Sequence, residues 1–213
     1  YHASYVNGVT LGQPGSIAGD PDAAALFDGV NDYVAPESLP FPGVQSLSIA
    51  LWTTPRSYQV NSEFGQIQLL LWANTGTAGN ITLQLDASPN PTGLQFYHWD
   101  GSTRQGISEG TVPTLGELVF IAGTYEHASG TWTLYRDAQV DTSVTGMFMT
   151  AKDGVAPRIA DHPAQNRHYD GWFDEVAFFD RALSANEIKR MHALGKRQDH
   201  HAPSAGLGIH TGL

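Results

Sequence analysis

Short runs of alternating apolar and polar residues dominate this chain, and clusters of Gly, Pro, Asn or Ser separate them. Such alternation is the signature of a β-strand whose two faces meet different surroundings. In the segment 46–53, for example, Leu47, Ile49 and Leu51 point one way and the intervening residues point the other. The pattern predicts further strands over 66–73, 80–86, 93–99, 117–125, 131–136, 156–160 and 172–179. Many short strands with almost no helical periodicity predict an all-β sandwich of two antiparallel sheets.

The last predicted strand leads into the one good helix pattern in the chain. Alternation over this strand assigns one face to Trp172, Asp174, Val176 and Phe178. Ser184 and Glu187 have capping-box spacing, in which the serine oxygen accepts a first-turn amide and the glutamate reaches back to the cap. Gly195 can adopt the left-handed conformation that ends a helix. The sequence therefore predicts one short, one-sided C-terminal helix.

Turn signals and a change in composition divide the chain into three parts. Turn signals at Asn7-Gly8 and Pro14-Gly15 make residues 1–23 an N-terminal arm or edge hairpin. Residues 24–195 form the predicted domain, and the Gly- and His-rich segment 196–213 is a flexible or docked C-terminal extension.

Composition limits the choice of partners. A chain of 213 residues that is 41% hydrophobic can bury the core of a single domain. Its net charge of −10 repels phosphate backbones and anionic lipids, so we expect no nucleic-acid binding and no membrane insertion. The absence of cysteine excludes disulfides and thiol chemistry but leaves the compartment open.

Four segments occur in an order that identifies a fold family: FDGVNDYV at 27–34, SLSIALWTTP at 46–55, GELVFIAGTYEHASGTWTLYRDAQV at 116–140 and YDGWFDEVAFFDRALSANEIKRMHALG at 169–195. They resemble laminin G-like domains of the concanavalin A-like lectin/glucanase class, and the opening VTLGQPGSIAGDPDAAALFDG at 9–29 looks like the domains of this kind found in phage minor tail proteins. The resemblance implies a jelly-roll sandwich. It also implies an edge strand that precedes the opening residues 1–27 and pairs near the Asp174-Glu175-Val176 strand; this edge strand is missing here or supplied by another chain. Two positions depart from the family pattern: Leu118 replaces a common tryptophan, and Asp137-Ala138 replaces Asp-Gly, which predicts a different turn.

The same resemblance implies a structural calcium ion at the sheet edge. The ligands it indicates are Asp28 and Asp174, with Asp32 as a further carboxylate. Calcium prefers several hard oxygen ligands, which carboxylates, carbonyls and waters supply. Alternatively, Asp28 and Asp32 serve only as hydrogen-bond acceptors in a turn.

Exposed aromatic rings beside polar loops are candidate saccharide sites, because sugars stack their C–H faces on such rings. The segment QFYHWDGSTR places Tyr97 and Trp99 on one strand face, with Asp100 and Arg104 in the loop that follows. Trp72 with Asn74 is a second candidate. The sequence assigns Trp52, Trp132 and Trp172 to the core, where sandwiches bury their aromatic side chains.

Motifs of catalysis are absent: the chain has no H-E-x-x-H, no G-x-S-x-G, no Walker-type loop and no E-x-D-x-x-E strand. We therefore predict a non-catalytic recognition or adhesion module that binds a surface polysaccharide within a larger virion or cell-surface assembly. Its location would be extracellular or on the virion surface. The alternative is a structural decoration domain that binds protein neighbours through an open sheet edge. A polysaccharide-cleaving enzyme is the least favoured reading.

Overall fold

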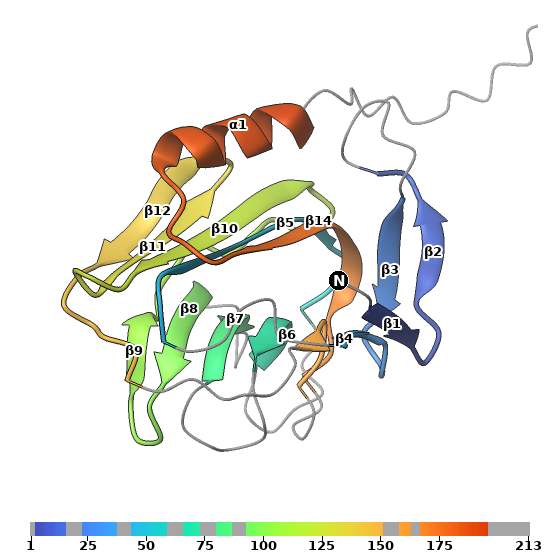
Figure 1. Cartoon of the computed structure of the whole chain (residues 1–213). Coiled ribbons are helices and arrows are strands. Elements are labelled where there is room, and N and C mark those ends of the chain that lie inside the picture. Colours follow the sequence, from blue (N-terminus) through green and yellow to red (C-terminus); the bar gives the residue numbers. More distant parts are fainter. Residues whose placement is uncertain are drawn as a thin grey trace, which may run out of the picture.

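The computed structural model describes residues 3–15, 23–37, 44–58, 66–72, 80–86, 93–150, 158–162 and 167–195, with 66–72, 80 and 86 described by backbone alone. Within these ranges two antiparallel sheets lie face to face and one helix covers the outside of one of them (Figure 1). The predicted all-β, two-sheet jelly-roll sandwich with a short C-terminal helix is confirmed.

Each sheet has seven described strands. The first sheet runs in the order β1 (Ala3–Val6), β4 (Tyr33–Pro36), β13 (Arg158–Ile159), β6 (Gln66–Trp72), β7 (Asn80–Asp86), β8 (Gly93–Trp99), β9 (Arg104–Ile107). The second runs in the order β12 (Gln139–Val144), β11 (Thr131–Arg136), β10 (Val119–Glu126), β5 (Leu47–Pro55), β14 (Asp170–Phe179), β3 (Ala24–Asp28), β2 (Thr10–Gln13). Strand β9 was not predicted, and Arg104 opens it rather than lying in a loop.

The main core lies between the sheets. On β5, Leu47, Ile49 and Leu51 are at most 1% exposed and point into it, as the alternation predicts. A second apolar cluster lies on the opposite face of the second sheet, where Trp52 and Phe120 pack beneath Ile188 of the helix. Each fully buried side chain of this size contributes about 1.5–3 kcal/mol. The second sheet is therefore covered on both faces over part of its area.

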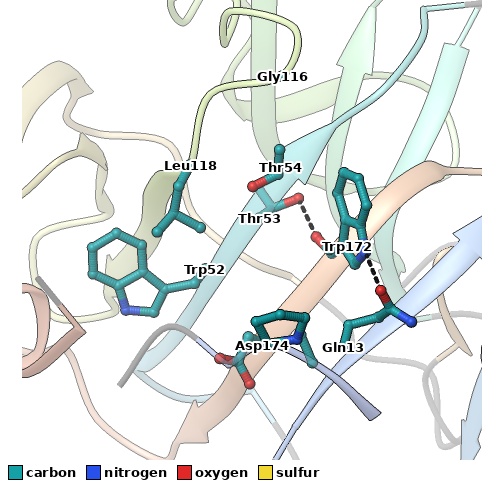
Figure 2. A pocket seen from close by; sticks show the side chains of 10 residues that line it. Gln13, Trp52, Thr53, Thr54, Gly116, Leu118, Trp172 and Asp174 are labelled. Atoms are coloured by element: carbon teal, nitrogen blue, oxygen red, sulfur yellow. Dashed lines mark hydrogen bonds between the residues drawn. The ribbon is translucent and has the colours of Figure 1, made fainter. Parts of the chain in front are cut away.

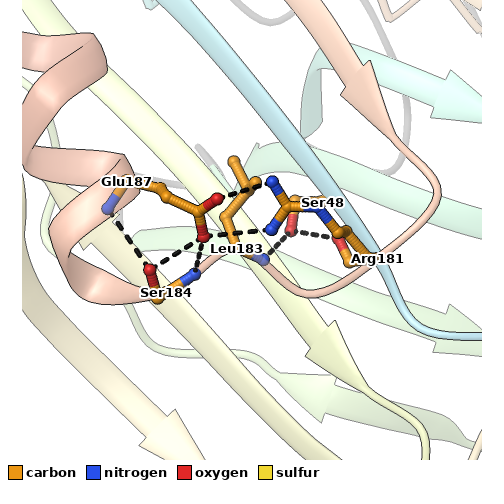
Figure 3. A network of polar contacts seen from close by, with 5 residues as sticks. All are labelled: Ser48, Arg181, Leu183, Ser184 and Glu187. Atoms are coloured by element: carbon orange, nitrogen blue, oxygen red, sulfur yellow. Dashed lines mark hydrogen bonds and ion pairs between the residues drawn. The ribbon is translucent and has the colours of Figure 1, made fainter.

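The helix α1 (Ala185–Gly195) begins at the predicted capping box (Figure 3). The Ser184 amide donates to Glu187 Oε2 at 2.9 Å, and the Glu187 amide donates to Ser184 Oγ at 3.4 Å. Arg181 donates to the same carboxylate at 3.0 Å and, with Ser184, lowers the pKa of Glu187 to about 2. Ser48 on β5 anchors the approach, because its Oγ accepts from the Leu183 amide at 2.8 Å. None of the helices formed by the described residues is long and apolar enough to cross a membrane.

A β-bulge interrupts β14. Its pairing with β5 shifts register just after Asp174, and Glu175 takes a left-handed φ of 51°. Trp172 and Asp174 lie on the outer face of the sheet, whereas Val176 and Phe178 pack against the main core. The predicted common face of these four residues is therefore wrong beyond the bulge, because the extra residue inverts the alternation.

The N-terminal strands close one side of the sandwich. Strand β1 pairs with β4 in the first sheet, and β2 pairs with β3 in the second. They are joined through Asn7 and Gly8, both at positive φ, and they do not pair with each other as a hairpin would. Strand β2 forms the edge of the second sheet beside β3, and the expected strand that would precede residues 1–27 stays a prediction.

The turn between β11 and β12 has both central residues in the left-handed region. Asp137 and Ala138 have φ values of 49° and 60°, as both central residues of a type I′ hairpin turn do. Backbone and carboxylate contacts hold it: the Asp137 amide donates to the Phe120 carbonyl at 2.9 Å, and Asp137 Oδ1 accepts from the Phe120 amide at 3.2 Å. Ala138 thus adopts a left-handed conformation at the position where the family pattern has glycine.

Candidate functional site

The predicted Tyr97–Trp99 surface lies on the outer face of the first sheet. The structure brings Tyr97 and Arg104 together: the guanidinium carbon lies 5.0 Å from the ring centroid, and Nη1 donates to Gln95 Oε1 at 3.3 Å. Tyr97 is nevertheless only 6% exposed, while Trp99 is half-buried and Arg104 exposed. Only the rim of this predicted surface is therefore open to a ligand.

Asp100 has a structural part in that hairpin. Its Oδ1 accepts from the amides of Ser102 and Thr103 at 2.8 and 2.7 Å, and Oδ2 accepts from the Thr103 hydroxyl at 2.8 Å. These hydrogen bonds from Thr103 and Ser102 hold the pKa of Asp100 well below its usual range. The carboxylate is thus engaged in closing the β8–β9 turn.

Beneath this hairpin a buried polar layer covers the strands. Gln84 Nε2 donates to Gln95 Oε1 at 2.6 Å, and Arg167 Nη1 donates to Gln84 Oε1 at 3.2 Å. Gln84 and Gln95 are 0% and 2% exposed. Hydrogen bonds thus link these three buried side chains on the outer side of the first sheet.

The second predicted pair cannot be compared with the structure. Trp72 ends β6, where only the backbone is described, and Asn74 lies outside the described residues. This pair stays a prediction.

The predicted calcium ligands are not brought together as one set. The register of β3 and β14 places Asp28 opposite Asp170, and Asp174 lies four residues further along β14. Asp28 and Asp32 do meet, since the Asp28 amide donates to Asp32 Oδ2 at 3.2 Å. Burial raises the pKa of Asp32 above its usual value.

The Asp28 side chain serves the same turn, because its Oδ1 accepts from the Val30 amide at 2.8 Å. Within the described part of the chain, no group of three or more Asp, Glu or His side chains is arranged to hold a metal ion. A structural calcium ion held by Asp28, Asp174 and Asp32 stays a prediction.

A groove that the sequence did not indicate lies on the outer face of the second sheet, beside α1 (Figure 2). Its volume is about 370 Å³. We call it the Trp172 groove; its walls are formed by Trp52, Leu118, Trp172, Asp174, Gln13 and Thr54, completed by Pro14, Ala24, Thr53 and Gly116. It combines two indole rings with one carboxylate, one amide and hydroxyl groups.

Trp172 is held at this groove from two sides. Its Nε1 donates to Gln13 Oε1 of β2 at 3.3 Å, and the Arg56 guanidinium carbon lies 5.7 Å from its ring centroid. It is half-buried and belongs to neither apolar cluster, so its assignment to the core is wrong. The one signal in the sequence was the Trp172–Asp174 spacing, which places a ring and a carboxylate on one strand face.

Trp52 forms the wall next to the helix. The His192 ring stacks on it with centroids 5.3 Å apart and planes 12° apart. Gly195 allows the helix end to approach, because a Cβ there would lie 2.2 Å from the indole. Trp52 is 2% exposed, as its predicted burial requires, and α1 therefore fixes one side of the groove.

Leu118 forms part of a further wall, in the loop that precedes β10. The Gly116 amide donates to the Pro55 carbonyl at 2.8 Å, which ties this loop to the end of β5. The departure from the family pattern at position 118 thus falls on the groove itself.

Carboxyl groups are few on the described walls of the groove. Glycosidases of the common type need two carboxyl groups about 5–9.5 Å apart. Among the described residues that line the groove, Asp174 alone carries a carboxyl group. A ligand with an apolar face and several hydroxyl groups would match this surface.

Comparison with solved structures shows the same fold at low sequence identity. Domain 4 of AbnA, a GH43 extracellular arabinanase from Geobacillus stearothermophilus solved with arabinotriose, gives a TM-score of 0.63 at 14% identity over 89% of this chain and 87% of that one. A SAP-like pentraxin from Limulus polyphemus gives 0.57 at 12% identity over 79% and 81%. The receptor binding domain of botulinum neurotoxin D gives 0.65 at 13% identity, with 91% of this chain matching 48% of that one.

A search among curated protein sequences found no relative. The family model Laminin_G_3, described as Concanavalin A-like lectin/glucanases superfamily, matches residues 28–189. This match spans all but the first N-terminal strands and the end of the helix. The chain therefore belongs to the Laminin_G_3 family of the concanavalin A-like lectin/glucanases superfamily.

Proposed function

We propose that the chain is a non-catalytic carbohydrate-binding module that binds a surface polysaccharide in the Trp172 groove. The observation that carries this proposal is the pairing of Trp52 and Trp172 with Asp174 in a groove of about 370 Å³. The setting we propose is extracellular or on a virion surface, as one part of a larger assembly.

The chemistry of the groove supports a saccharide. Sugar rings present apolar C–H faces, which pack on indole, and hydroxyl groups, which need nearby acceptors and donors. The half-buried Trp172 ring offers the apolar surface, while Asp174 and Gln13 offer polar atoms beside it.

Structural neighbours support the same class of function. Domain 4 of AbnA was solved with arabinotriose, and the botulinum neurotoxin D domain is named for receptor binding. The single carboxyl group among the described groove residues is the reason to propose binding without catalysis.

One observation favours a second candidate, an assembly domain that binds protein neighbours. Strand β2 is the outermost strand of the second sheet, and its Leu11 is 53% exposed. An outer strand offers unpaired backbone groups to a neighbouring chain. Leu11→Pro should abolish the binding of a partner that adds a strand there, and it should leave saccharide binding unchanged.

The test is a binding assay on immobilised arabinan, galactomannan and dextran. It compares the parent with Trp172→Ala and Trp99→Ala, which remove one ring from each candidate surface. We expect the parent to bind at least one polysaccharide and Trp172→Ala to lose about 1–3 kcal/mol of binding free energy, as loss of a stacking ring does elsewhere. Trp99→Ala should bind like the parent.

Circular dichroism of each variant controls for folding, and no large change is expected because neither ring belongs to the described apolar clusters. Loss of binding in Trp99→Ala with full binding in Trp172→Ala would move the site to the Tyr97 face. Equal binding by all three proteins would exclude both surfaces.

A further inference from the structure

The Trp172 groove contains a single charged group among its described lining residues, the carboxylate of Asp174. The other polar side chains on its walls, Gln13, Thr53 and Thr54, are neutral. No described lysine, arginine or histidine belongs to the lining. The described lining of the groove is thus acidic, in a chain whose net charge is −10.

The bulge in β14 fixes where this charge lies. Asp174 is paired across the ladder with Trp52, and its Oδ1 accepts from the Glu175 amide at 3.1 Å. Cross-strand neighbours have Cβ atoms about 4.5–5.5 Å apart, and residues two apart on one strand about 7 Å. A ligand that lies against Trp172 therefore approaches the carboxylate of Asp174, two residues further along β14.

Among the described residues, the Arg56 side chain lies beside the groove, and it forms an ion pair with Asp170. The Arg56 guanidinium carbon lies 5.7 Å from the Trp172 ring centroid, and Arg56 Nε lies 3.1 Å from Asp170 Oδ1. An acidic ligand would have to compete with Asp170 for this cation. Hydroxyl groups, by contrast, donate strong charge-assisted hydrogen bonds to a carboxylate.

We infer that the Trp172 groove selects uncharged saccharides against uronate, sulfate or phosphate derivatives, and that Asp174 sets this selectivity. This inference rests on the proposed function. Two like charges about 7 Å apart in a partly hydrated groove weaken binding about tenfold or more. The selectivity therefore depends on the side chain of Asp174 and not on the net charge of the chain.

The experiment compares matched derivatives of arabinan, galactomannan and dextran. Each polysaccharide is immobilised in its carboxymethylated form and in its hydroxyethylated form, which blocks similar hydroxyl groups without adding charge. The proteins are the parent, Asp174→Asn, Asp174→Ser and Glu109→Gln. Glu109 is exposed and outside the groove lining, so its variant removes the same net charge elsewhere.

We expect the parent and Glu109→Gln to bind a hydroxyethylated polysaccharide at least about tenfold more tightly than its carboxymethylated partner. In both Asp174 variants this ratio should fall below about threefold, since the like charge is gone. Two neutral replacements guard against an unfolded variant, because they disturb the bulge differently.

Two results would overturn the inference and leave saccharide binding in place: equal binding of both derivatives by the parent, or an unchanged ratio in the Asp174 variants. Failure of the parent to bind any neutral or hydroxyethylated polysaccharide would instead contradict the proposed function. The two failures are thus distinguishable.

Discussion

At the scale of single residues, Leu118 controls how much space the Trp172 groove offers. It lines the groove, and its loop is tied to β5 through the Gly116 amide. A tryptophan at this position would project more ring into the open volume of about 370 Å³. We expect Leu118→Trp to abolish polysaccharide binding, because the ligand and the new indole would occupy the same space.

The control for this variant is Leu115→Trp, in the same loop. Leu115 is 45% exposed and does not line the groove, so an added ring there stays in solvent. Thermal unfolding and the immobilised-polysaccharide assay should show both proteins folded and only Leu118→Trp inactive. Full binding by Leu118→Trp would place the ligand elsewhere.

Asp100 makes a different kind of contribution, to the turn and not to a ligand. Its carboxylate accepts hydrogen bonds from Ser102, Thr103 and Gln105. We expect Asp100→Ala to lower the melting temperature and Asp100→Asn to lower it less, because the amide keeps one acceptor oxygen. Saccharide binding by either folded variant should equal that of the parent; a selective loss of binding would restore Asp100 to the site.

The indoles show how far residue-level prediction reaches. Burial of Trp132 and Trp52 is confirmed, since they are 0% and 2% exposed. Trp172 shares the outer face with Trp52, but α1 covers one ring and leaves the other half-buried. Alternation reveals which residues share a face, whereas the cover over that face depends on contacts between distant segments.

At the scale of elements, the end of α1 fixes the groove wall through Gly195. A Cβ at this position would lie 2.2 Å from Trp52 Cε2, so the helix end or the ring must move. We expect Gly195→Ala to destabilise the fold by about 1–3 kcal/mol, as overpacking does in other proteins. It should also weaken polysaccharide binding, because Trp52 lines the groove.

Chemical unfolding and the binding assay measure these two effects. Lys189→Ala, at an exposed position of the same helix, is the matched control and should leave both unchanged. Parent-like stability and binding in Gly195→Ala would show that the helix end does not support the groove.

The cap of α1 should make the stability of the domain depend on pH. The contacts of Glu187 with Arg181 and Ser184 lower its pKa from 4.5 to about 2. A depressed carboxyl pKa stabilises the fold above the unfolded value and loses that contribution as the pH falls through the folded value. Stability should therefore decline between pH 4.5 and about 2.

Glu187→Gln removes this titration. At neutral pH the free energy of unfolding of the variant should therefore be lower than that of the parent, and the two values should converge near pH 2. Urea unfolding across this pH range measures both proteins. Parallel pH profiles for the two proteins would mean that the capping contacts contribute nothing.

Elements with local causes were predictable, and elements with distant partners were not. The capping box of α1 and the alternation of β7, β8 and β11 depend on residues that are neighbours in the sequence. The bulge after Asp174 and the separate pairing of β1 and β2 depend on strands far away in the sequence. The groove arises where these unpredicted features meet, which explains why the sequence did not reveal it.

At the scale of the whole molecule, two sheets enclose one core and leave two outer faces with different character. On the first sheet, hydrogen bonds link the buried side chains of Gln84, Gln95 and Arg167. On the second, the helix covers part of the face (Figure 1), and the Trp172 groove lies next to the covered part (Figure 2). The order of the four family segments predicted this sandwich, but not which face would hold a cavity.

The central claim is that saccharides contact the Trp172 groove, and the indole N–H signals of the chain's five tryptophans in a nitrogen-15 NMR spectrum test it most directly. The protein would be titrated with arabinotriose, mannotriose and isomaltotriose. With at least one of these, the Trp172 signal should shift while that of Trp132, which is 0% exposed, stays in place. A shift of the Trp99 signal without Trp172, or no shift with any trisaccharide, would contradict the account.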